Sequence, residues 1–124
     1  MSLEIKYNRK HHIVESIFSD IITEEELILE TTQCIALGNE NSTNLFLCDA
    51  SNAIVYLGLI NVLELEKIHI EENLERTSKI ALIEPISKES KNFASFYETA
   101  CLNRGWNVKI FQDRQTAIGW LQER

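Results

Sequence analysis

The chain has 124 residues, of which 44% are hydrophobic and 25% are charged, and its net charge at neutral pH is −7. A chain of this length can bury a core without disulfides or metals, so we expect one domain spanning residues 1–124. The negative charge, with no cluster of Lys and Arg to offset it locally, argues against nucleic-acid phosphate as a partner.

The three cysteines, Cys34, Cys48 and Cys101, are far apart in the sequence and lie among apolar residues. This placement predicts buried, reduced thiols. The N-terminus lacks the charged start and apolar run of a signal peptide. The longest apolar stretch, residues 53–65, is interrupted by polar residues and is too short to span a bilayer. We therefore expect a cytoplasmic protein that does not span a membrane.

The first forty residues predict a hairpin followed by a helix. Apolar and polar residues alternate around a polar turn at residues 8–12, which is typical of two antiparallel strands. Thr23 precedes Glu26 by three residues, and this capping-box pattern starts a helix. Gly38 and Asn39 are residue types that end helices, so we expect the helix to stop there.

Residues 44–51 predict a buried strand that leads into the apolar segment 53–65. Although residues 54–56 also suit a strand, we favour a helix for this segment, with a break near His69 and a short helical turn at 71–76. Four apolar residues of the segment recur at helical spacing: Tyr56, Leu59, Ile60 and Leu63. Because the segment is apolar over most of its circumference, three interpretations stay open: burial in the monomer, the lining of an apolar pocket, or a homodimer interface.

The second half of the chain is more regular. Residues 79–85 predict a short strand that ends at Pro85, and Ser87 is placed to cap the next helix. Gly105 follows the last turn of that helix. The apolar stripe of the helix recurs at i, i+3, i+4, i+7 and i+8: Phe93, Phe96, Tyr97, Ala100 and Cys101.

A strand at residues 106–111 and a helix capped by Asp113 complete the chain. Ala117, Trp120 and Leu121 turn one face of this helix inward, with Trp120 as the large anchor. The predicted order is β-β-α-β-α-β-α-β-α. It indicates an α/β fold in which an N-terminal β-hairpin joins a mixed, mostly parallel sheet through right-handed crossover helices.

The second half carries a resemblance to a known family. The strand "KIALIEP", the aromatic-rich helix, "NRGWNVKIF" and the closing A-x-x-W-L resemble the C-terminal half of SpoIIAA-like proteins. These are small bacterial STAS-type domains related in fold to the lipid-binding Sec14/CRAL-TRIO core. The resemblance implies this fold and a binding or regulatory role without catalysis.

Anti-sigma antagonists of that group carry a phosphorylatable serine after a central strand, at the start of a helix. The matching loop here is "CDASNA", which places Ser51 beside Asp49. Asn52 and Ala53 stand where the group has a second hydroxyl residue and a glycine. From the residues alone, Ser51 is interpreted as a helix N-cap.

No catalytic or metal-binding set emerges from the remaining polar residues. Cys48 has no histidine near it in the sequence, so a structural thiol is favoured over a nucleophile. His11 and His12 are adjacent and point apart, and His69 has no partner at ligand spacing. The glutamates, Glu30 among them, are interpreted as solvated helix faces. We expect no enzyme activity, metal or cofactor.

Three functional hypotheses follow. The first is a non-enzymatic module that binds a protein partner or a second copy of the chain. The second is a carrier or sensor of a small apolar, lipid-like ligand held between segment 53–65 and the sheet. The third is an anti-sigma-antagonist-like regulator phosphorylated at Ser51. The interaction or ligand surface of the first two consists of Asp49, Tyr56, Leu59, Ile60 and Leu63.

Overall fold

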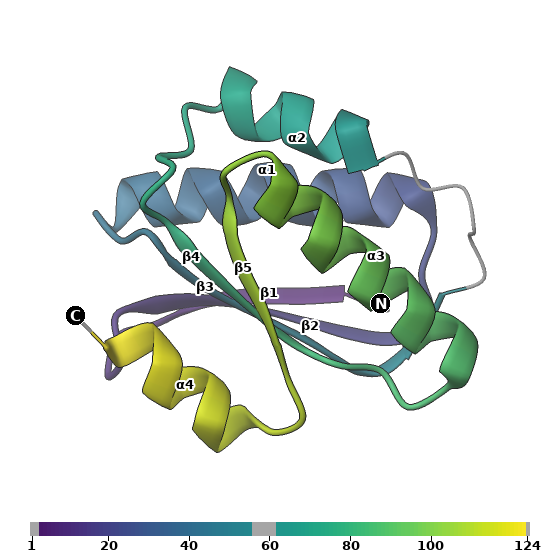
Figure 1. Cartoon of the computed structure of the whole chain (residues 1–124). Helices are drawn as coiled ribbons and strands as arrows, with labels where there is room; N and C mark the ends of the chain where they lie inside the picture. Colours follow the sequence, from purple (N-terminus) through teal and green to yellow (C-terminus); the bar gives the residue numbers. More distant parts are fainter. Residues whose placement is uncertain (1–2, 56–61, 124) are drawn as a thin grey trace.

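A computed structural model describes residues 3–55 and 62–123 of the chain (Figure 1). The elements are β1 (Leu3–Asn8), β2 (Ile13–Ile21), α1 (Glu24–Glu40), β3 (Leu45–Ile54), α2 (Val62–Glu71), β4 (Lys79–Ile83), α3 (Lys88–Asn103), β5 (Asn107–Phe111) and α4 (Arg114–Gln122). This order confirms the predicted β-β-α-β-α-β-α-β-α sequence of elements.

The strands form a mixed sheet in the order β1-β2-β3-β4-β5, in which β1 and β2 are antiparallel and the later neighbours are parallel. Each crossover adds a strand on the same side of the previous one. Right-handed crossovers in a constant direction place their helices on one face of the sheet. Accordingly α1, α2 and α3 cover one face, and α4 alone covers the other (Figure 1).

Local signals place the first helix, but its predicted end is wrong. Thr23 Oγ1 accepts a hydrogen bond from the Glu26 amide, and the Glu26 side chain accepts one from the Thr23 amide, so the capping box is confirmed. The helix continues past Gly38 to Glu40. Gly38 serves close packing instead, because a Cβ there would lie 2.9 Å from the Thr43 carbonyl oxygen.

The middle of the chain departs most from the prediction. β3 continues to Ile54 instead of ending at residue 51, because β2 extends beside it to Ile21 and supplies a pairing partner. α2 runs through His69 without a break. Beyond Glu71, residues 72–73 form a turn with Asn73 at φ 59°, in place of the short helical turn predicted at 71–76.

A β-bulge lies in the extended part of β3. The pairing of β2 with β3 shifts between Ile17 and Ser19, so that Ala50 and Ser51 lie opposite one residue of β2. An extra residue of this kind changes which face the following side chains occupy. Ala50 and Ala53, three residues apart, consequently both belong to the buried core beneath α1 and α3.

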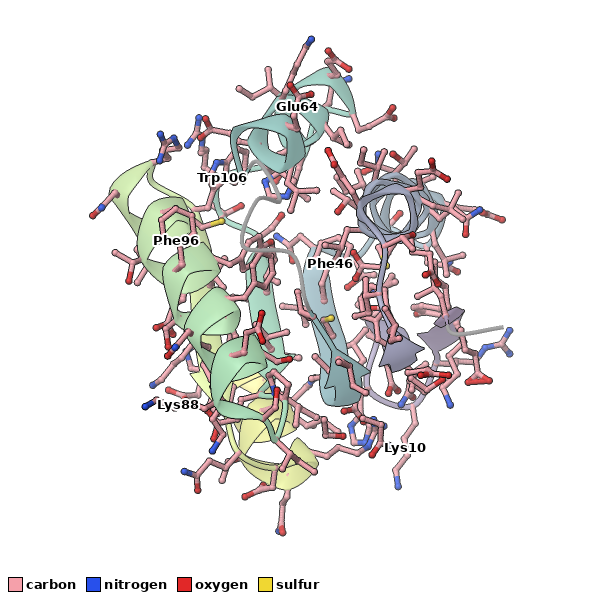
Figure 2. All side chains as sticks on the ribbon, turned by 90° about the vertical axis from the view of Figure 1, so that its right-hand side faces the viewer. Lys10, Phe46, Glu64, Lys88, Phe96 and Trp106 are labelled. Atoms are coloured by element: carbon pink, nitrogen blue, oxygen red, sulfur yellow. The ribbon has the colours of Figure 1, made fainter. Side chains whose placement is uncertain are left out.

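The apolar stripe of α3 is confirmed except at one position. Ser87 caps the helix, Cys101 is buried, and Phe93 packs against the core. Phe96, however, is 61% exposed and projects from the outer side of α3 (Figure 2). Gly105 has φ 85° beyond the helix end, a conformation that glycine adopts without strain.

The inward face predicted for the closing helix is confirmed at Ala117 and Leu121, but Trp120 is not its buried anchor. Ala117 and Leu121 are fully buried in a cluster with residues of β2, β3 and β4. Trp120 is only half-buried and packs against Phe111, with ring centroids 5.5 Å apart. The buried indole of the chain is Trp106, which is 3% exposed.

A buried ion pair also fastens α4. Glu15 on β2 has a side chain that is 1% exposed, and the Arg114 guanidinium bonds both of its carboxylate oxygens. The Asn8 amide donates a further hydrogen bond at 2.6 Å. The hydrogen bonds from Arg114 hold the pKa of Glu15 below its usual value, against the opposing effect of burial.

We expect Leu121→Ala to lower the free energy of unfolding by about 2–5 kcal/mol, because it opens a cavity under α4. Trp120→Ala removes a larger side chain that packs against this cluster but is only partly buried, so its cost should be smaller. Urea denaturation of the two variants checks the order. A larger loss for Trp120→Ala would contradict the packing described for α4.

Glu15→Gln should destabilise the protein by about 1–2 kcal/mol at pH 7, toward the lower end because Arg114 is half-exposed and screened by solvent. Because the folded-state pKa is depressed, the stabilisation is present above the unfolded pKa and is lost as pH falls through the folded value. The difference between wild type and variant should therefore shrink below about pH 4. Denaturant midpoints at pH 7 and pH 3 test this, and a constant difference would refute it.

Candidate functional site

A cavity of about 100 Å³ lies between the sheet and the three helices α1, α2 and α3. Its walls are mostly aliphatic and aromatic side chains from both layers. Figure 2 shows one of them, Phe46 of β3, in the interior between α1 and α3. Others include Phe18, Leu27, Leu65, Phe93 and Ala94. A concave, apolar site with a few converging polar groups is the usual form of a small-molecule pocket.

The polar groups of the cavity converge from two strands and one helix. Ser16 and Cys48 are register partners on β2 and β3, so their side chains share the face beneath α1. Glu30 and Cys34 lie one turn apart on α1. Ser16 Oγ donates to Glu30 Oε2 at 2.6 Å, and both thiols lie close enough to the same carboxyl group to influence its pKa.

The carboxyl group of Glu30 is removed from water but is not paired with a cation in the described part of the chain. The residue keeps some exposed surface, but its carboxyl lies against Ser16 and the two thiols. Burial therefore raises the pKa of Glu30, and the hydrogen bond from Ser16 offsets only part of the increase. The described residues form no ion pair with it, in contrast to Glu15.

The interpretation of Glu30 as part of a solvated face is thus wrong. Its position on α1 carries a usable signal, since Leu27, Thr31 and Cys34 at i−3, i+1 and i+4 form the inward stripe around it. A charged residue inside such a stripe points toward the core. The charge of Glu30, taken by itself, predicts a position on the protein surface.

The thiols are held in their protonated form. Burial raises the pKa of Cys34 and of Cys48, and the nearby Glu30 carboxyl raises both further. Burial also raises the pKa of Cys101, to about 11. All three cysteines are free, as the sequence predicts; Cys34 and Cys101 are buried, whereas Cys48 is partly buried.

His69 adds a further polar group to the cavity, from α2. It is 3% exposed, lines the cavity, and its ring packs edge-on against Trp106 with centroids 4.8 Å apart. Burial, aided by Arg76, lowers its pKa to about 4, so the imidazole is neutral near pH 7. Its Nδ1 atom is buried and has no hydrogen-bond partner in the part of the chain that the structure describes. A buried polar atom of this kind costs free energy unless another group satisfies it.

The residues proposed as a phosphosite lie elsewhere. Ser51 is in the bulged part of β3, and its hydroxyl and amide both donate to Asp49 Oδ1, at 2.6 and 3.0 Å. Because β3 continues to Ile54, the N-cap interpretation of Ser51 is wrong. Neither Asp49 nor Ser51 lines the cavity, and phosphorylation of Ser51 stays a prediction.

The predicted interaction surface also includes four apolar residues of segment 53–65. Tyr56, Leu59 and Ile60 lie outside the described residues, as does the side chain of Leu63. The part of segment 53–65 that the structure does describe contributes Val55 and Leu65 to the cavity wall.

Two negative observations apply to residues 3–55 and 62–123. Within these ranges, no group of three or more His, Cys, Asp and Glu side chains could hold a metal ion. No helix there is both long and apolar enough to cross a membrane.

Comparison with known proteins identifies the fold. The chain matches no family model and no curated protein. Among solved structures, it is similar to an uncharacterised protein of the DUF3478 family with a SpoIIAA-like fold from Shewanella loihica PV-4. The TM-score is 0.60, the sequences are 17% identical, and the match covers 96% of this chain and 91% of the other.

The chain has a SpoIIAA-like fold. This confirms the resemblance seen in the second half of the sequence and the predicted mixed, mostly parallel sheet. At this level of identity the likeness extends to the fold alone, so function has to be argued from the cavity.

We expect Glu30→Gln to stabilise the protein at pH 8 by on the order of 1 kcal/mol, because it removes a desolvated charge and keeps an acceptor for Ser16. The raised folded-state pKa means that the carboxyl favours folding below its unfolded pKa and loses this contribution as pH rises through the folded pKa. The gain should therefore vanish near pH 4.

Glu40→Gln, an exposed change of equal charge on the same helix, is the matched control. Thermal melts of both variants at pH 8 and pH 4 provide the comparison. If the two substitutions have the same effect at both pH values, Glu30 is not desolvated as described.

Proposed function

We propose that the protein is a non-enzymatic binding module that holds a small molecule with an apolar body in the cavity beneath α1, α2 and α3. One observation carries this proposal: an apolar cavity contains a carboxyl group without a countercharge and an imidazole nitrogen without a hydrogen bond. Among the described residues, Glu30 has no cationic partner, and His69 Nδ1 has no hydrogen-bond partner. A ligand would satisfy groups that otherwise reduce stability.

The chemistry of the cavity supports binding over catalysis. A nucleophilic cysteine needs a lowered pKa, from a cation or an adjacent base. The pKa values of Cys34 and Cys48 are shifted the other way by burial and by Glu30. The neutral His69 is acted on by Glu66 and Arg76, which lie outside this cluster. Neither cavity thiol is therefore activated as a nucleophile by a group that the structure describes.

The volume of the cavity limits the size of the ligand. An apolar cavity of about 150 Å³ holds a benzene molecule. The cavity here, at about 100 Å³, is smaller but partly open, so it suits a single ring or a short aliphatic chain. A ligand of that size is a narrower proposal than the lipid-like molecule expected from the sequence, since a long acyl chain would not fit.

Contact with a protein partner or a second copy is a second candidate. Ile21 and Ile54 are register partners at the carboxyl ends of β2 and β3, and they are 49% and 36% exposed. Ile86, just beyond β4, is 78% exposed. Exposed aliphatic side chains near one edge of a sheet support an interaction surface.

The cavity can be tested by filling it. Ala94 is 3% exposed and lines the cavity from α3, so Ala94→Leu should occupy part of the volume. We expect benzyl alcohol and benzylammonium to shift NMR signals of cavity residues in wild type, and Ala94→Leu to weaken that binding by at least about tenfold. Ala100→Leu, a partly buried position on the same helix that does not line the cavity, should bind like wild type.

Native mass spectrometry of the protein purified from cells gives an independent readout, because an added small mass should be present in wild type and absent in Ala94→Leu. Unchanged probe binding in a folded Ala94→Leu variant would refute the proposed site.

A further inference from the structure

We infer that the ligand of this cavity is a small organic amine, whose ammonium group binds the Glu30 carboxylate while its apolar body fills the cavity. The inference rests on the proposed function and adds the chemical class of the ligand. It follows from the missing charge partner of Glu30, the acceptor capacity of its carboxylate and the aromatic character of the walls.

The first step is a comparison of two carboxyl groups, Glu15 on β2 and Glu30 on α1, which lie on opposite faces of the sheet. Both Glu15 and Glu30 are removed from water, and a buried charge is tolerated when it is paired and hydrogen-bonded. Glu15 has the Arg114 guanidinium on both of its oxygens. The groups that act on Glu30 come from α1, β2, β3 and α3, and none is cationic: Ser16, Thr31, Cys34, Cys48 and Tyr97. Among the described residues, no cationic side chain lies beside Glu30 as Arg114 lies beside Glu15.

The second step is the hydrogen-bond capacity of the carboxylate. Ser16 donates its single hydroxyl proton to Oε2. Thr31 Oγ1 lies 3.4 Å from Oε1, but it is bonded at 2.9 Å to the Leu27 carbonyl oxygen, which takes its only proton. Thiols are weak donors. Oε1 therefore keeps acceptor capacity that an ammonium group, with several N–H donors, could use.

The third step concerns the aromatic side chains in the cavity wall. Phe46, Phe93 and Tyr97 are aromatic side chains of the cavity lining. Aromatic faces attract cations and also pack against an apolar body. A neutral alcohol would gain the packing, but it would leave an ionised Glu30 without a countercharge. An amine with an apolar body supplies both the countercharge for Glu30 and the packing against the aromatic walls.

The amine proposal requires a defined pH dependence. Ammonium binding favours the ionised form of Glu30, so affinity should fall as pH drops through the pKa of that carboxyl, which burial raises. The other titratable groups of the cavity should not change charge between pH 5 and 8. Burial raises the pKa of Cys34, Cys48 and Tyr97, and the pKa of His69 is about 4.

Benzylammonium and benzyl alcohol form a matched pair of probes, since they share one ring and differ in the donor group. Calorimetric titration of wild type at pH 8 should show the ammonium binding at least about tenfold more tightly than the alcohol, a ratio worth about 1.4 kcal/mol. The ratio should fall toward one as the pH is lowered through the raised pKa of Glu30. Glu30→Gln should abolish the preference at pH 8, and Glu40→Gln should retain it.

The outcomes separate this inference from the proposed function. Equal binding of the two probes to wild type, or an ammonium preference that persists in Glu30→Gln, would overturn the amine class and leave the cavity as a site for neutral ligands. Failure of wild type to bind either probe would overturn both proposals. The pH dependence of wild type decides the matter even if Glu30→Gln proves poorly folded.

Discussion

The constant direction of strand addition determines how this molecule is built. From β2 onward, each parallel strand joins the sheet on the same side, and right-handed crossovers then place α1, α2 and α3 on one face. That face needs three helices from separate crossovers to cover it, and the cavity lies beneath them. The opposite face has α4 alone, which docks closely through Ala117 and Leu121. The two faces therefore differ in packing for a topological reason.

A buried carboxyl group also has different surroundings on the two faces of the sheet. On the α4 face, Glu15 is paired with Arg114 and its pKa is lowered. On the cavity face, Glu30 meets hydroxyl and thiol groups, and its pKa is raised. A desolvated carboxyl without a cation reduces stability in the ionised form, whereas the same group with a guanidinium stabilises the fold. Residues that reduce stability in this way are concentrated at functional sites.

The errors of the sequence prediction have a common origin. Ser51 was interpreted as a helix cap because a polar residue follows an apolar run, yet β2 continues alongside and extends β3 past it. Trp120 was chosen as the anchor of α4 for its size, yet the smaller Leu121 occupies the contact with the sheet. Glu30 was assigned to the surface for its charge. In each case the prediction relied on a property of one residue, whereas the packing of a neighbouring element determines where that residue lies.

The sequence by itself determined the order of the elements and most of their ends. The capping box at Thr23, the caps at Ser87 and Asp113 and the left-handed Gly105 act through contacts within a few residues, so they can be recognised without knowing the fold. Only the tertiary structure decided that Ser16, Glu30 and Cys48 would meet. These residues come from different elements, and the solvation of a charge depends on what the rest of the chain packs around it.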